Sequence, residues 1–274
     1  MLSGCSSGGG GSLLTSDELL GDAPEAGAAG PSQDRPVAGS GSAVVIRHDP
    51  NVPPGILDSI EETMAYARQD FGDSGPIVVH VYSTSEAFIA AHEPRAREQA
   101  RKDIEGGSFA QAGSGVIWIY TPTYAKSRTN SRRLTLLHEY FHTVQRSLSG
   151  PSRSRLPLWL VEGSAKYFEV RVGSDRGYTY FEKDRENNLV KSKALGPLAK
   201  YETEGASKAR GGNGEAYTLG FVASDYLVQT KGVDALKRDF WTLLASTPDW
   251  KTAFTQAFGT SVEAFYADFE AQRS

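Results

Sequence analysis

The chain has 274 residues, 39% of them hydrophobic and 10% aromatic, so it is long enough to bury one sizeable core. Its 29 basic and 33 acidic residues give a net charge of −4, and a chain with this balance is not expected to bind nucleic acid. A single cysteine excludes an intramolecular disulfide, and no apolar run reaches the roughly 18 residues that a membrane-spanning helix needs.

Residues 1–42 are dominated by Gly, Ser, Ala and Pro, and we expect them to form a disordered tether because such a segment cannot bury enough apolar surface. Within it, "LSGC" ending at Cys5, followed by "SSGGGGS", resembles the lipobox of bacterial lipoproteins. The resemblance implies a lipid anchor at Cys5 and an extracytoplasmic location on a bacterial membrane. Only four residues precede Cys5, so this hypothesis requires a truncated signal peptide. The alternative is a plain disordered N-terminus.

Residues 43–274 are expected to form one folded domain, which begins with alternating strands and helices. "SAVVIRH" (42–48), "GPIVVHVYS" (75–83) and "GVIWIYTP" (115–122) are rich in β-branched residues and predict strands. Apolar residues at helical spacing predict a helix over 54–71. Residues 85–105 are expected to be helix and loop, and 106–115 a glycine-rich loop.

After residue 130 the pattern becomes helical. Helices are predicted over 131–148 and from Pro157 to about Val172, and three or four amphipathic helices over 215–272. Between them, 173–214 is polar and is expected to be irregular. The sequence therefore predicts an α+β fold, with a small N-terminal mixed sheet and a mostly helical C-terminal half.

The segment "HEYFH" suggests a metal site on the first of these helices. His138 and His142 are four residues apart, so a helix presents both imidazoles on one face about 6 Å apart. Glu139 projects about 100° around the helix from His138, where it can reach a water on the metal and act as a base. These three polar side chains lie beside an apolar helix face, where burial is costly unless they have partners. The alternative that the histidines merely fill the core explains this pattern poorly.

Catalytic zinc takes three protein ligands and leaves a fourth position for water. Twenty residues after His142, "WLVEG" supplies Glu162. "HEYFH" with this second motif resembles the gluzincin metallopeptidases, which include the thermolysin and aminopeptidase N families. The resemblance implies a zincin fold and one zinc ion per chain, held by His138, His142 and Glu162.

The resemblance has further implications. The strand "GVIWIYT" is similar to the edge strand on which gluzincins hold an extended substrate. "AYTLGFVASDYLVQ" resembles the helix whose tyrosine faces the metal, which makes Tyr217 a candidate to stabilise the oxyanion, although a buried helix aromatic is the alternative. Thermolysin relatives carry an aspartate where this chain has Lys166, so Glu169 is a candidate to orient a ligand instead. His48, His80 and His92 have no ligand spacing and are expected to be structural or exposed.

We therefore expect a zinc peptidase that acts on peptide or protein substrates with Glu139 as general base. Residues 106–115 lack the glutamate with which aminopeptidase N relatives capture a free amino terminus, so endopeptidase-like cleavage is favoured over aminopeptidase activity. A noncatalytic surface lipoprotein that keeps the fold as a binding module would also carry these residues, as would a zinc hydrolase of another bond. Membrane contact is expected only through the anchor at Cys5, and the sequence leaves the oligomeric state open.

Overall fold

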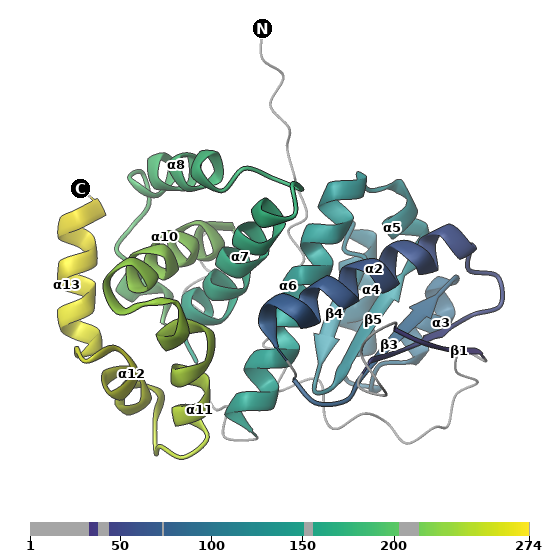
Figure 1. Ribbon diagram of the computed structural model, residues 1–274, viewed down its shortest axis with the longest axis horizontal. Coiled ribbons are helices and arrows are strands. Elements are labelled where there is room, and N and C mark those ends of the chain that lie inside the picture. Colours follow the sequence, from purple (N-terminus) through teal and green to yellow (C-terminus); the bar gives the residue numbers. More distant parts are fainter. Residues whose placement is uncertain (1–32, 38–43, 73, 151–155, 203–213, 274) are drawn as a thin grey trace, which may run out of the picture.

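The fold begins with a small mixed sheet. In the computed structural model, which describes residues 33–37, 44–72, 74–150, 156–202 and 214–273, five strands pair in the order β1-β2-β3-β5-β4 (Figure 1). The strands are β1 (Gln33–Pro36), β2 (Val44–His48), β3 (Ile77–Tyr82), β4 (Ala110–Gly113) and β5 (Val116–Tyr120). β2, β3 and β5 run parallel, whereas β1 and β4 are antiparallel to their neighbours. β2, β3 and β5 are rich in Val and Ile, whose branched side chains pack well on a pleated surface.

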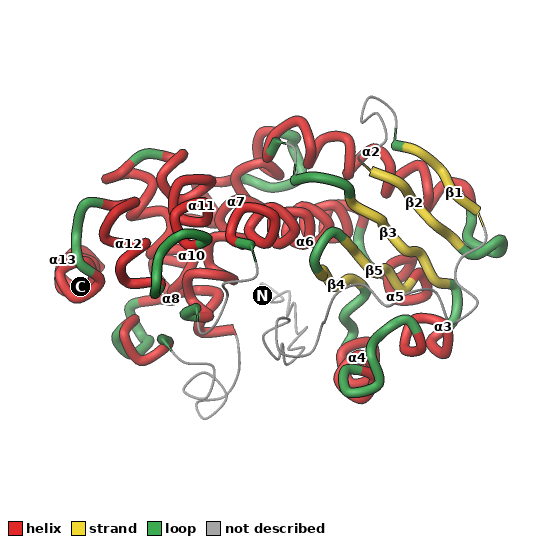
Figure 2. Tube along the Cα trace, turned by 90° about the horizontal axis from the view of Figure 1, so that it is seen from below, coloured by secondary structure: helices red, strands yellow, loops and turns green. Residues whose placement is uncertain are grey.

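Helices cover both faces of this sheet. α2 (Pro54–Phe71) and α6 (Thr129–Ser149) lie on one face, and α3 (Ser85–Ala90) and α4 (Arg97–Glu105) lie on the other (Figure 2). α2 connects β2 to β3 and packs against α6 and the sheet through apolar residues at helical spacing, including Ile60, Met64 and Phe71. Because α6 lies against β4 and β5, the sheet fixes the position of the helix that carries the two histidines.

The chain after β5 is helical. Its further elements are α5 (Thr121–Lys126), α7 (Leu158–Asp175), α8 (Phe181–Ser192), the 3-10 turn η1 (Leu198–Tyr201), α10 (Gly214–Lys231), the π-helical η2 (Ala235–Asp239), α11 (Phe240–Leu244), α12 (Trp250–Phe258) and α13 (Val262–Arg273). α7 packs against α6 on one side and α10 on the other, so it lies between the sheet layer and the helical layer (Figure 1).

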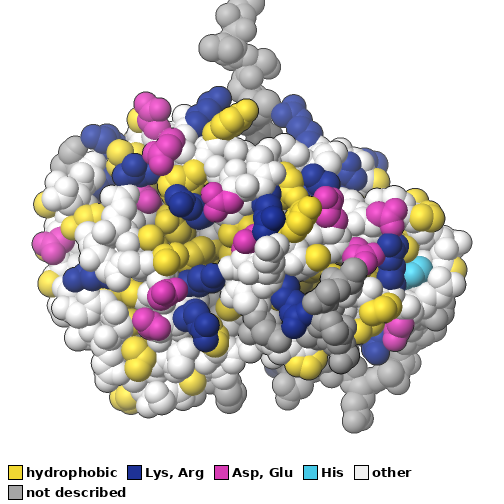
Figure 3. Space-filling view, viewed as in Figure 1, with side chains coloured by type: hydrophobic (Ala, Val, Ile, Leu, Met, Phe, Trp, Pro, Cys, Tyr) yellow, Lys and Arg dark blue, Asp and Glu magenta, His cyan; other side chains and the backbone are white. Residues whose placement is uncertain are grey.

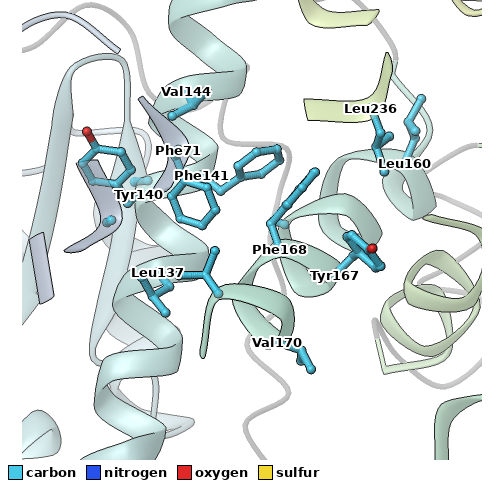
Figure 4. Packing of buried hydrophobic residues seen from close by; sticks show 14 of the residues in the cluster. Phe71, Leu137, Tyr140, Phe141, Val144, Leu160, Tyr167, Phe168, Val170 and Leu236 are labelled. Carbon is cyan, nitrogen blue, oxygen red and sulfur yellow. The ribbon is translucent and has the colours of Figure 1, made fainter. Parts of the chain in front are cut away.

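An aromatic cluster joins the two layers. Phe141 of α6 and Phe168 of α7 face each other with ring centroids 4.5 Å apart, and Phe71 of α2 completes the contact (Figure 4). Each buried aromatic pair is worth about 0.5–1.5 kcal/mol beyond the area it buries. The cluster therefore sets the spacing between the helix of the two histidines and the helix of Glu162.

A glycine pair permits an unusually close contact between α7 and α10. Gly163 and Gly220 lie against each other, and a Cβ atom built on Gly220 would lie 2.7 Å from the Cα atom of Gly163 and closer still to the Trp159 carbonyl oxygen. No residue with a side chain fits such a backbone-to-backbone approach. The crossing lies one residue from Glu162 and three residues from Tyr217 along their helices.

Several sequence predictions need correction. Residues 33–36 form β1, so ordered structure begins before the expected boundary at residue 43. β4 lies within the expected glycine-rich loop, and β5 (the strand "GVIWIYT") is an interior strand between β3 and β4, not an edge strand. The edge is β4, because the chain reverses after Gly113 and pairs β4 against the outer side of β5.

The polar segment that was expected to be irregular contains α8 and η1. α8 has Glu182 and Asp184 in its first turn and Lys191 in its last, which complement the helix dipole. Only a narrow face of α8 packs on the body, mainly through Phe181, so its apolar periodicity is too weak to predict a helix. The rest of that segment, 203–213, and the expected tether and anchor, 1–32 with Cys5, lie outside the described residues.

The surface is mixed in charge. On the face seen in Figure 3, Lys and Arg side chains are interspersed with Asp and Glu side chains, and hydrophobic side chains gather over the area where α8 and α10 lie. One pocket is lined by Leu189 of α8 and by Phe221 and Tyr226 of α10. Among the described helices, none combines the length and the apolar character needed to cross a membrane.

Candidate metal centre

The two histidines lie in the middle of α6, on the side that faces α7. His138 and His142 are both buried, at 7% relative exposure, between apolar neighbours such as Leu137 and Phe141. Their ring planes are nearly perpendicular, with centroids 4.6 Å apart. The apolar residues fix the orientation of α6, and the histidines occupy the part of the same buried surface that meets α7.

Three ligand atoms converge at this point. The Nε2 atoms of His138 and His142 are 3.0 Å apart, and they lie 3.2 and 3.4 Å from Oε2 of Glu162. Three donors at the zinc distance of about 2.0–2.1 Å in tetrahedral geometry lie about 3.3 Å from one another. His138, His142 and Glu162 therefore form a buried group that could hold a metal ion, and their spacing fits the size of zinc.

The outer nitrogens of the imidazoles favour the same interpretation. Nδ1 of His142 lies 2.8 Å from Oε1 of Gln145, and Nδ1 of His138 lies 3.2 Å from Oε2 of Glu169. Both oxygens can accept a hydrogen bond from a protonated Nδ1, and in that tautomer each Nε2 would direct a lone pair at a metal ion held together with Glu162. The three inner atoms are so close that a cation, either a proton or a metal ion, must lie between them.

The pKa shifts at the site also indicate that it stabilises a cation. Burial lowers the pKa of His138, but the bonds and charges of Glu162 and Glu169 outweigh it and raise this pKa to about 10. Burial likewise raises the pKa of Glu162, but His142 and His138 outweigh it and hold that pKa well below its ordinary value. The carboxylates thus stabilise positive charge at this point, whether it is a proton or a metal ion.

Both supporting residues are themselves held in place. Lys166 donates to Oε1 of Glu169 at 2.6 Å, so the lysine holds the carboxylate that faces His138. Gln145 is 3% exposed, and its Nε2 donates to the carbonyl of Val161 and to Oγ of Ser164, both at 3.0 Å. Gln145 thus ties the helix of the histidines to the helix of Glu162.

Sequence reasoning proposed the role of Glu169 but missed Gln145. Its position three residues after His142, on the same helix face, was the available signal. Glutamine is common on helix surfaces, however, and only the packing of α7 gives this one its partners.

Glu139 lies beside the three ligands without joining them. Its side chain is partly exposed, whereas His138, His142 and Glu162 are buried. Burial raises its pKa, and the positive charges of His142 and His138 partly offset the effect. A carboxylate with a raised pKa takes up a proton more readily, which suits a general base.

Tyr217 extends from α10 over the site. Its ring stacks on His138 with centroids 5.8 Å apart and planes inclined by 23°. Burial and the charge of Glu162 raise its pKa well above its ordinary value, so the phenol stays protonated and can donate a hydrogen bond. The close Gly163–Gly220 crossing brings α10 near enough for this contact.

The other histidines lie away from the site. His48 bonds the neighbouring carbonyl of Asp49, His92 bonds Gln111 and the carbonyl of Phe88, and His80 lies on β3 beside Tyr82. By contrast, all five residues that the sequence singled out for the chemistry come together at one place in the fold. They are His138, Glu139, His142, Glu162 and Tyr217.

Comparison with known proteins gives no independent assignment: no protein-family model matches the chain, and no curated protein matches it significantly.

Proposed function

We propose that this protein is a zinc-dependent peptidase of the gluzincin type, with one zinc ion per chain held by His138, His142 and Glu162. The observation that carries the proposal is the convergence of two Nε2 atoms and one carboxylate oxygen within 3.0–3.4 Å of one another. Glu139 beside them supplies the base that a purely structural metal site would not need.

The chain's own residues divide the work of hydrolysis. A bound zinc ion would supply Lewis acidity, which makes water a better nucleophile near neutral pH and polarises the substrate carbonyl. Glu139 takes the proton from the attacking water and passes it to the leaving amine. Tyr217 donates its phenolic proton in a hydrogen bond to the oxyanion as it develops. Gln145 and Glu169 hold the histidines in orientation throughout.

The proposed substrate is an extended peptide. β4, not β5, offers the outer edge along which such a chain can add as a further strand, and α6 lies next to it. The β4 residues Ala110, Gln111, Ala112 and Gly113 include no carboxylate to pair with a free amino terminus. We therefore favour endopeptidase-like cleavage over removal of single N-terminal residues.

Zinc content and proteolysis test the proposal together. Elemental analysis of the purified chain should find one zinc per protein, and a double His138→Ala, His142→Ala variant should lose it. An unstructured protein such as casein should be cleaved, and a chelator should stop cleavage until zinc is restored. His48→Ala, a histidine remote from the site, serves as the matched control and should keep both properties.

The glutamate base is tested separately. Glu139→Gln preserves size but cannot accept the proton, so it should keep zinc and lose about 10²- to 10⁴-fold in rate. Glu263→Gln, an exposed change on α13, is the matched control. Zinc binding without cleavage by the parent protein would favour the noncatalytic binding module. Activity of Glu139→Gln within about twofold of the parent would exclude Glu139 as the base.

A further inference from the structure

A buried chain of hydrogen-bonding side chains connects the edge strand β4 to the helices on the face of the sheet opposite α6. His92 follows α3, with its Nδ1 2.8 Å from the carbonyl oxygen of Phe88 and its Nε2 2.7 Å from Oε1 of Gln111 in β4. Nε2 of Gln111 in turn donates to Oδ2 of Asp103 in α4 at 2.6 Å. His92 and Asp103 are 2% and 3% exposed, so these groups must satisfy one another without water.

Both ends of this chain are fixed. The ring of His92 packs on the ring of Trp118 in β5, with centroids 4.9 Å apart. Asp103 accepts at Oδ1 from Nε2 of Gln99 at 2.7 Å. The amide of Gln111, between the two ends, is therefore the group that can turn over, which exchanges its oxygen and nitrogen with little change of shape.

The donors and acceptors do not balance for a neutral histidine and an ionised aspartate. Both ring nitrogens of His92 face an oxygen, yet a neutral imidazole has one N–H. One added proton resolves the conflict in either of two ways. It can reside on His92, with Asp103 ionised and the amide of Gln111 oriented as described above. Alternatively it resides on Asp103, and the turned amide of Gln111 accepts from that carboxyl group and donates to Nε2 of His92.

Burial favours the form with the proton on Asp103, because that form places no charge inside the protein. Burial raises the pKa of Asp103, against a smaller opposing effect of the amide bond that it accepts within α4. Burial also lowers the pKa of His92 against its two hydrogen bonds, and the charge of Arg97 in α4 lowers this pKa further. The rings that pack on His92 from α3 and β5 are those of Phe88 and Trp118, which do not titrate.

We propose that His92, Gln111 and Asp103 share one proton, carried by the aspartate, and that this proton makes them a pH-sensitive latch on β4. Once the proton is lost, every orientation of the amide and every tautomer of the imidazole leaves two acceptors in contact. The connection to β4 then weakens, since a buried acceptor without a donor is unfavourable. Because folding raises the pKa of Asp103, this stabilisation is present at low pH and is lost as the pH rises through the raised pKa.

The latch acts on the strand beside the candidate metal centre. β4 is an outer strand of the sheet, and α6 packs against it. A proton bound on one face of the sheet therefore controls how firmly the edge next to α6 is held. The inference assumes neither a bound metal nor peptidase activity, so it stands or falls separately from the proposed function.

Asp103→Asn is the decisive variant, because asparagine is a permanent copy of the protonated aspartate. Its NH2 group donates to Oε1 of Gln111, and its oxygen still accepts from Gln99. Hydrogen–deuterium exchange of the full chain is measured from about pH 4.5 to about pH 9, and the protection of β4 is divided by that of β3 in the same sample. In the parent we expect this ratio to fall about tenfold as the pH rises, and in Asp103→Asn to stay at its low-pH value.

Two further variants separate the latch from general effects of charge. Glu98→Gln makes the same acid-to-amide change at an exposed position of α4 and should retain the pH dependence of the parent. Gln111→Met removes the link itself and should show the low ratio at every pH. Carbon NMR of the parent gives a measurement that needs no variant: the carboxyl carbon of Asp103 should titrate at the pH at which the ratio falls.

Four results would overturn the proposal. They are a ratio that does not change with pH in the parent, a parent-like pH dependence in Asp103→Asn, a low ratio in Asp103→Asn at every pH, and an Asp103 carboxyl carbon that does not titrate where the ratio falls. Because the carbon measurement uses the parent protein, the proposal is tested even if Asp103→Asn does not fold.

Discussion

Under the proposed function, the crossing of α7 and α10 at Gly163 and Gly220 predicts that a single methyl group on α10 impairs catalysis without removing the metal. In Gly220→Ala the new Cβ atom would lie 2.2 Å from the carbonyl oxygen of Trp159 and 2.7 Å from the Cα atom of Gly163, whereas ordinary contact begins at 3.4 Å. The helices must therefore separate by about 1.2 Å, and α10 is expected to move because α7 is held against α6 by Phe141 and Phe168.

The effects on stability and activity can be estimated separately. Overpacking costs about 1–3 kcal/mol, and the better helix propensity of alanine offsets about 1 kcal/mol, so we expect unfolding to become easier by about 1–2 kcal/mol. Tyr217 moves with α10, whereas the three ligands do not. A displacement of this size in a transition-state donor is expected to lower kcat by about 10- to 100-fold.

The assay compares kcat, zinc content and urea unfolding for Gly220→Ala, Tyr217→Phe and the double variant. Gly214→Ala is the matched control, since it lies on the same helix with no atom near the added methyl group. If Gly220 acts by positioning Tyr217, the two changes together should lower kcat no further than Tyr217→Phe alone. An equal fall in kcat from Gly220→Ala with and without the tyrosine hydroxyl would refute this reasoning, as would loss of zinc from Gly220→Ala.

Three further predictions concern other parts of the chain. Gln145→Ala removes the acceptor for Nδ1 of His142 and should weaken zinc binding about 10- to 100-fold in a chelator competition, whereas Gln229→Ala, on exposed α10 surface, should not change it. Burial, with a smaller effect of Arg47, lowers the pKa of His80 to about 4, so its neutral form stabilises the fold fully above pH 6.5 and this contribution is lost as the pH falls toward 4. Urea unfolding of the zinc-free protein at pH 7, 5.5 and 4 should therefore show a decline that is smaller by up to about 3 kcal/mol in His80→Gln, and an identical decline would contradict the assignment. Cys5→Ala, expressed with a complete native start, should move the protein from the detergent phase to the aqueous phase, and unchanged partitioning would exclude the lipid anchor.

The sequence by itself determined the local parts of this protein. Helical spacing is a property of neighbours along the chain, so "HEYFH" was enough to place His138 and His142 on one helix face, with Glu139 to one side of them. The helix 54–71 was predicted with its observed ends, and the strands 42–48, 75–83 and 115–122 contain β2, β3 and β5. The periodicity of apolar residues within one segment is sufficient for such predictions, because a single helix or strand is specified by a few adjacent residues.

Only the tertiary structure decided how these parts meet. The sequence could not show that β5 is interior and β4 is the edge, because strand order depends on pairings between distant segments. α8 was missed because its stability comes from charge at its ends and a narrow packed face rather than from a strong apolar stripe. Gln145 and Arg146 follow His142 closely in sequence, yet their partners depend on what α7 and β4 place beside them. A residue's type and spacing state which contacts it can make, and packing between distant segments selects the contacts that it does make.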